Sequence, residues 1–145
     1  MTAEAEADVD VDDGLVTVAC NGSVRETIDR LQEAITASGF QVFARIDHAD
    51  HAARIGLELR PTELLIFGKP EGGTQLMQDR QTAGIDLPSK ALAWQDAAGD
   101  TWVTCNDASW LAARHGLGPA SEAGVAAVEA STVAAVRQAT GPAAV

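Results

Sequence analysis

The chain has 145 residues, and its 21 Asp and Glu against 10 Lys and Arg give a formal net charge of −11. This charge disfavours nucleic acids and anionic membranes as partners, because both are themselves negatively charged. Hydrophobic residues make up 46 % of the chain, which is typical of a folded globule, and the length fits one domain with one core. No signal peptide and no apolar run of about 20 residues is found, so the sequence predicts a soluble, cytoplasmic protein.

An acidic segment opens the chain. Residues 1–13 contain six carboxylates and few apolar groups. Ordering such a segment would cost conformational entropy with little apolar burial in return. We therefore expect residues 1–13 to be a disordered acidic tail and residues 14–140 to form a single domain.

The clearest predicted element is a helix that follows a β-branched run over residues 15–20. Ser23 and Glu26 form an S-x-x-E capping box at its start, and Gly39 ends it. Its apolar face recurs at spacings of three and four residues and consists of Val24, Ile28, Leu31 and Ile35.

The middle of the chain predicts short strands separated by loops. Residues 40–46 alternate, so that Phe40, Val42, Ala44 and Ile46 are expected on one face and Gln41, Phe43 and Arg45 on the other. A short helix over 49–56 and an apolar strand over 62–67 follow. The Gly- and Pro-rich stretch 68–73 is predicted to be a loop before a helix over 74–80, and 84–88 a second loop.

The last third predicts a β-hairpin over 91–105, a short helix over 107–115 and a final Ala- and Val-rich helix ending near Gln138. Regular alternation of strands and helices is missing, which argues against a doubly wound parallel sheet. The sequence therefore predicts an α+β fold, with a mainly antiparallel sheet and helices on one face.

Several short motifs resemble those of the DUF302 family, a domain of unknown function. They are Ile46-Asp47-His48, the stretch 59–70 (LRPTELLIFGKP), the stretch 84–88 (GIDLP), Asn106-Asp107 and the stretch 114–117 (RHGL). The resemblance covers about residues 14–140. It implies a curved antiparallel sheet like half of the TATA-binding-protein saddle, and a homodimer, but no agreed activity.

Two groups of side chains are candidates for chemistry. Asp47, His48 and His51 have helical spacing and are ligand types for a metal or haem, or for acid–base catalysis. The alternative is that Asp47 caps a helix and that the histidines lie on the surface. Cys20 and Cys105 form no C-x-x-C pair and have no basic neighbour in sequence, so we interpret them as small buried thiols.

The stretch 68–74 allows two interpretations: an ordinary loop whose Thr74 caps the next helix, or an anion site at a helix N-terminus. Asp107, Arg114 and His115 complement the dipole of the short helix that they bracket. The three tryptophans are expected to be core or dimer contacts. Together with the apolar strand 62–67, they lead us to predict a homodimer.

The leading functional hypothesis is a non-catalytic small-molecule-binding or stress-associated accessory protein. The alternative is a metal- or haem-binding protein or an enzyme that uses the Asp47/His48/His51 cluster. We place the ligand site in loops and at strand ends, where scaffolds commonly present functional groups. Its predicted residues are His48, Phe67, Gly68, Pro70, Asp86 and Pro88.

Overall fold

The structure, a computed structural model, describes residues 10–140. Its core is a six-stranded sheet in the order β1-β2-β6-β5-β4-β3, and every neighbouring pair is antiparallel. The strands are β1 (Asp10–Asp12), β2 (Leu15–Cys20), β3 (Gln41–Asp47), β4 (Thr62–Gly68), β5 (Ser89–Gln95) and β6 (Thr101–Asn106).

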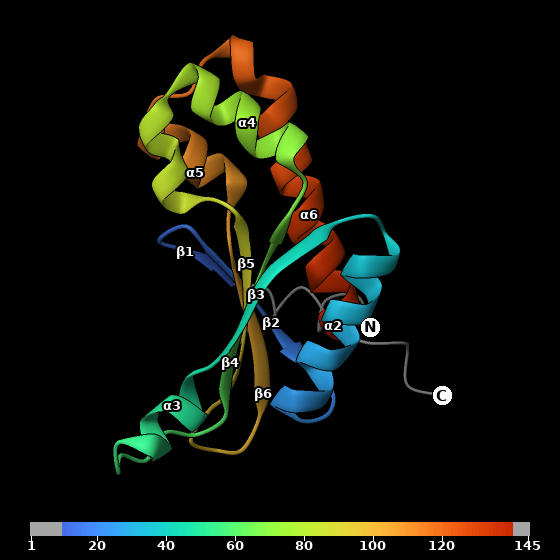
Figure 1. Cartoon of the computed structure of the whole chain (residues 1–145), viewed down its shortest axis with the longest axis vertical. Coiled ribbons are helices and arrows are strands. Elements are labelled where there is room, and N and C mark those ends of the chain that lie inside the picture. Colours follow the sequence, from blue (N-terminus) through green and yellow to red (C-terminus); the bar gives the residue numbers. More distant parts are fainter. Residues whose placement is uncertain (1–9, 141–145) are drawn as a thin grey trace.

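Helices cover one face and both ends of this sheet. They are α2 (Val24–Ala37), α3 (His48–Arg54), α4 (Pro70–Asp79), α5 (Ala108–His115) and α6 (Glu122–Thr140), with short 3₁₀ turns at Gln81–Asp86 and Pro119–Ser121. In Figure 1, α2 and α6 lie on the same side of the strands, α4 and α5 lie at one end, and α3 lies at the opposite end. The predicted α+β fold with an antiparallel sheet is confirmed.

The hydrophobic core lies between the sheet and the helices α2 and α6. Ile28 and Leu31 of α2 are fully buried and belong to one cluster with Leu65 and Phe67 of β4. The predicted apolar face of α2 is therefore the face that packs on the sheet. The predicted capping box is also present: the Glu26 N–H donates to Ser23 Oγ at 3.1 Å, and the Ser23 N–H donates to Glu26 Oε1 at 3.0 Å.

The predicted alternation of β3 is wrong after Val42, because the strand contains a β-bulge. Val42 pairs with Phe67, but Ala44 pairs with Ile66, so Phe43 is an extra residue on β3. A bulge shifts the pattern of faces by one residue. Arg45 therefore lies with Leu65 on the face of the sheet that α2 covers, and Ala44 lies on the opposite face.

Part of the predicted acidic tail forms a strand. Asp10–Asp12 pair with β2 as an edge strand, and the remaining part of the predicted tail, residues 1–9, lies outside the described residues. The turn between β1 and β2 packs against Trp110, since a Cβ on Gly14 would lie only 2.4 Å from the indole. Strand pairing and packing thus offset the conformational entropy cost of ordering this segment, although its composition predicts disorder.

The helix α4 begins four residues earlier than predicted, so most of the expected Gly- and Pro-rich loop is helical. Pro70 occupies the first helical turn, where its missing N–H and its fixed φ are compatible with a helix. Gly72 lies against α6, with only 3.1 Å between a virtual Cβ and the Cβ of Ala127. Contact between two helices therefore stabilises a segment whose local propensity is poor.

The two cysteines are free thiols that face the core side of the sheet. Burial raises the pKa of Cys20 to about 11 and that of Cys105 to about 12. Both pKa values agree with the interpretation of small buried thiols, since thiolates are the reactive form.

We expect neither thiol to react with a disulfide reagent at pH 8 in the native protein, and both to react after denaturation. Because both pKa values are raised in the folded state, the thiols favour folding up to the unfolded pKa, and this contribution is lost as the pH rises through the folded pKa values. The free energy of unfolding should thus decrease above about pH 9. Rapid labelling of native protein at pH 8 would contradict this assignment.

Candidate functional site

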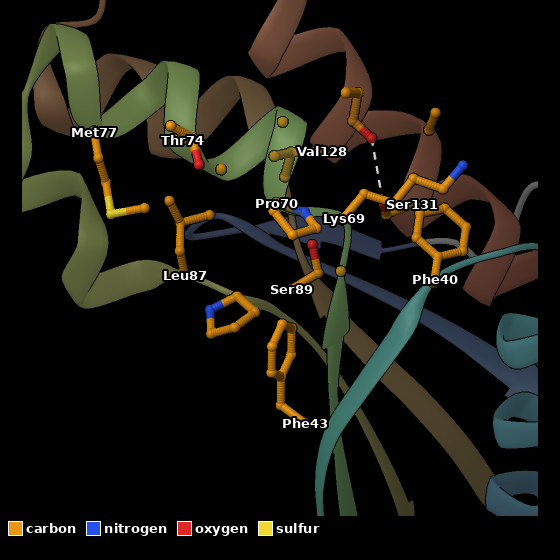
Figure 2. Close-up of a pocket in the computed structure, with 16 residues that line it drawn as sticks. Phe40, Phe43, Lys69, Pro70, Thr74, Met77, Leu87, Ser89, Val128 and Ser131 are labelled. Atoms are coloured by element: carbon orange, nitrogen blue, oxygen red, sulfur yellow. Dashed lines mark hydrogen bonds between the residues drawn. The ribbon is translucent and has the colours of Figure 1, made fainter.

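A cavity of about 440 Å³ lies where the ends of β3 and β4 meet α4 and α6. Its walls are mainly apolar, and small-ligand sites commonly have volumes of about 300–1,000 Å³. The strands contribute Phe43, Gly68 and Ser89. Phe40 directly precedes β3, and Leu87 and Pro88 come from the segment before β5. Figure 2 shows Phe43, Leu87 and Ser89 below α4, and Phe40 beside α6.

The helices α4 and α6, which form one wall of the cavity, cross closely. Thr74 and Met77 of α4 and Val128 and Ser131 of α6 line this side. The crossing is close because Gly124 of α6 has no side chain: a Cβ there would lie 2.7 Å from Leu76 Cδ1 and 2.9 Å from the Gly72 carbonyl oxygen.

The β-bulge in β3 places Phe43 at the cavity. Phe43 is 47 % exposed although it is a large apolar side chain, and it lines the cavity together with Phe40. In Figure 2 its ring lies below Pro70 and Ser89. An apolar ligand in the cavity would therefore gain contact area with a ring that is otherwise half in water.

Polar groups in the lining are few and come from three elements. Lys69 precedes α4, and its ammonium lies 4.7 Å from the centre of the Phe40 ring. Hydroxyls are contributed by Thr74, Ser89 and Ser131, of which Ser131 donates to the Ala127 carbonyl at 3.2 Å. A small number of polar groups in an apolar cavity is the usual arrangement for orienting a small ligand.

Of the six residues predicted for ligand binding, three line this cavity: Gly68, Pro70 and Pro88. Phe67 lies next to it in the core, where its ring makes an edge contact with Phe40 at 6.2 Å between centroids. The structure thus brings the predicted glycine and prolines together from two separate segments.

The other two predicted residues lie elsewhere. Asp86 Oδ2 is 2.6 Å from His115 Nε2 and 3.1 Å from Arg114 Nη1, so Asp86 joins the 3₁₀ turn to α5. His48 begins α3 at the far end of β3, since Gln41 pairs with Gly68 whereas the residue before His48 pairs with Glu63.

The predicted Asp47/His48/His51 cluster lies at the start of α3. Asp47 Oδ1 accepts from the Asp50 N–H at 2.9 Å, and its Oδ2 forms an ion pair with Arg25 at 3.0 Å. Asp47 therefore caps the helix, and its carboxylate is already paired. Among the side chains that the structure describes, no three His, Cys, Asp or Glu residues are arranged to hold a metal ion.

Sequence reasoning did not find most of the cavity. Phe43 is hidden by the bulge, and Val128 and Ser131 lie on a helix whose apolar residues share no clear face in the sequence. Met77 lines the cavity and is 36 % exposed. The available signal was the pair of glycines at 72–73, which we interpreted as loop residues.

Comparison with known proteins identifies the class of this fold. The family described as "Domain of unknown function DUF302" matches residues 16–139. A solved structure, the uncharacterized conserved protein DUF302 from Bacillus stearothermophilus, superposes with a TM-score of 0.76 at 22 % identity, over 88 % of this chain and 99 % of that chain. The chain belongs to the DUF302 family.

Curated relatives of this chain are longer proteins. A protein of Brucella suis biovar 1 named "Fluoride-specific ion channel FluC 1" is 48 % identical over 131 residues, which cover 90 % of this chain and 52 % of the relative. A protein of the same name from Brucella abortus biovar 1 is also 48 % identical, over 90 % of this chain and 48 % of its own length. The chain thus spans about half the length of these relatives. Within residues 10–140, no helix is long and apolar enough to cross a membrane.

Proposed function

We propose that this chain is a non-catalytic domain that binds a small, largely apolar molecule in the cavity between α4, α6 and the sheet. The observation that carries the proposal is the cavity itself: about 440 Å³, with walls from Phe40, Phe43, Met77 and Val128 and few polar groups. Transfer of an apolar ligand from water to such walls yields about 25 cal/mol per Å² of buried apolar area. The described part of the chain places no histidine, cysteine or carboxylate side chain in the lining, so the residues there suit binding better than acid–base or metal chemistry.

Filling the cavity should abolish binding without unfolding the protein. Thr74 is exposed on α4 and lines the cavity, so in Thr74→Phe the new ring can occupy the ligand volume. We expect the native protein to increase the fluorescence of the neutral probe N-phenyl-1-naphthylamine, and Thr74→Phe to lose this increase while keeping its Tm. Gln78→Phe is the matched control, because Gln78 is exposed one turn further along α4 and does not line the cavity. Equal binding by both variants would contradict the assignment.

We further propose that the uncovered face of the sheet forms a homodimer interface. Leu64, Leu92, Trp94 and Trp102 lie on this face, as the cross-strand pairs Leu64–Leu92 and Trp94–Trp102 show. The two indoles stack at 6.2 Å. Their N–H groups donate within the chain, from Trp94 to Thr104 and from Trp102 to Asp96, both at 2.9 Å. The rings therefore present apolar surface with no unpaired donor, which is typical of an interface.

Introducing a charge in the centre of this face should give a monomer. We expect light scattering to report a dimer mass for the native chain at micromolar concentration and half that mass for Leu92→Glu, because an unpaired carboxylate in an apolar interface is costly to desolvate. Thr36→Glu, on the exposed side of α2, controls for the added charge. A native chain with monomer mass throughout this range would refute the dimer.

A second candidate function follows from the curated relatives. Because half of each protein named as a fluoride-specific channel matches this chain at 48 % identity, we propose as the alternative that the domain is an accessory module of such a channel. Fluoride is a single small anion and does not require a cavity of about 440 Å³, so this role concerns the channel protein rather than fluoride as the ligand. Removal of the matched region from the Brucella suis protein should then lower the fluoride resistance of cells. Unchanged resistance at equal protein level would exclude this role.

We propose the cytoplasm as the location. Cys20 and Cys105 are free thiols in the structure, and free thiols are typical of reducing compartments. Fractionation of cells followed by detection of the untagged chain would test this assignment.

A further inference from the structure

The cavity carries a positive charge although the protein as a whole is acidic. The whole chain has a net charge of −11, yet among the residues that the structure describes Lys69 is the single ionisable side chain in the lining. In the described part of the chain, none of the ion pairs involves Lys69. Its ammonium lies over the Phe40 ring at 4.7 Å, so the positive charge at the cavity is not neutralised by a carboxylate.

The charged group of the cavity lies at one side. Figure 2 shows Lys69, Phe40 and Ser131 together at one side, whereas Met77 and Leu87 lie at the opposite side. The side chain of Lys69 is exposed at this edge, and its four-carbon stem allows the ammonium to turn toward a ligand without displacing the backbone. A ligand with one charged end would therefore have a preferred orientation.

We propose that the ligand of this cavity is an amphipathic monoanion, with its apolar body between α4 and α6 and its carboxylate or sulfonate group at Lys69. This inference depends on the proposed function, because it specifies the ligand class of the same cavity. One ammonium offsets one negative charge at short range, whereas the net charge of the protein repels further negative charge at longer range. The cavity thus disfavours phosphate monoesters and other dianions, and an uncharged apolar ligand forgoes the attraction of Lys69.

Two fluorescent probes that share an aromatic framework test separately whether the cavity binds a ligand and whether Lys69 binds the anionic group of that ligand. N-phenyl-1-naphthylamine is neutral, and 8-anilinonaphthalene-1-sulfonate has nearly the same framework with one anionic group. Fluorescence titration at low ionic strength gives a Kd for each probe with the native chain, Lys69→Gln and Arg54→Gln. Arg54→Gln removes the same unit charge from α3, at the opposite end of the sheet, where Arg54 is exposed and pairs with Asp50 at 2.8 Å.

We expect Lys69→Gln to weaken binding of the anionic probe by about two- to fivefold, which is the upper part of the range for a largely solvent-exposed ion pair. The neutral probe should bind Lys69→Gln as it binds the native chain, and Arg54→Gln should affect neither probe. The difference between Lys69→Gln and the native chain should decrease in high salt, because salt screens exposed charges.

The outcomes distinguish the two claims. If the neutral probe binds but Lys69→Gln leaves the Kd of the anionic probe unchanged, the monoanion inference is overturned and the cavity remains a ligand site. If the anionic probe fails to bind while the neutral one binds, the inference is also overturned. If neither probe binds, or if both still bind to Thr74→Phe, the proposed function fails, and the inference fails with it.

Discussion

Replacing Glu63 by leucine is expected to lower the free energy of unfolding by about 2–3 kcal/mol, equivalent to about 5–10 °C in Tm. Glu63 lies on β4 under α2 and is 4 % exposed. Its two oxygens accept from Arg25 Nε and Arg45 Nε, each at 3.1 Å. Removing the carboxylate leaves two guanidinium groups without their buried partner. Because Arg25 is 65 % exposed, we expect a smaller loss than for a fully buried pair.

A matched control tests whether burial is the cause. Asp29 also pairs with Arg45, at 2.7 Å, but its side chain is 59 % exposed. Asp29→Asn should therefore change stability by less than about 1 kcal/mol. Glu63→Gln keeps an acceptor oxygen for one arginine and should lie between the two. Thermal unfolding of all three variants measures the order, and a Glu63→Leu variant as stable as Asp29→Asn would contradict the role of the buried carboxylate.

Adding one methyl group at Gly124 is expected to lower the free energy of unfolding by about 2–3 kcal/mol, in the upper part of the range for overpacking. The new Cβ would lie 2.8 Å from Gln75 Cβ and 2.9 Å from the Gly72 carbonyl oxygen. A backbone atom cannot move aside as a flexible side chain can, so α4 and α6 must separate. This cost exceeds the gain of about 1 kcal/mol that alanine provides over glycine inside a helix.

Gly73→Ala is the control, because Gly73 also lies inside a helix but has no atom closer than 3.6 Å to its virtual Cβ. There the helix propensity of alanine should leave stability unchanged or raise it by up to about 1 kcal/mol. Chemical denaturation of both variants provides the comparison. Since Ala127 and Val128 of α6 line the cavity, Gly124→Ala should also weaken probe binding. Equal stability of the two alanine variants would show that the helix crossing tolerates a side chain.

Local sequence determined the elements whose signals lie within a few residues. The helix α2 has both its capping box and its predicted apolar face, because caps and helical spacing act over one to four residues. The hairpin of β5 and β6 also forms as predicted. Its turn is closed by Asp96 Oδ1, which accepts from the N–H groups of Ala98 and Asp100, and by Gly99 with a φ of +92°.

Tertiary structure decided the features that depend on distant partners. The sequence reads residues 68–73 as a loop, but contact of Gly72 with α6 makes most of them helical. Phe43 follows a regular alternation in sequence, yet pairing with β4 inserts it as a bulge and turns it to the cavity. A bulge depends on the register between two strands, which no local pattern of one strand contains.

Local sequence predicts one part of the candidate site, and tertiary structure decides the rest. Sequence by itself identified Gly68, Pro70 and Pro88 as a group, because glycine and proline at strand ends mark positions where the backbone is constrained. It also grouped His48 with them, although β3 and β4 run antiparallel and place His48 at the far end of the sheet. The cavity itself needs walls from two helices and three strands, which come from separate parts of the chain. Only their packing, set by the absence of a side chain at Gly124, creates the volume that a ligand would occupy.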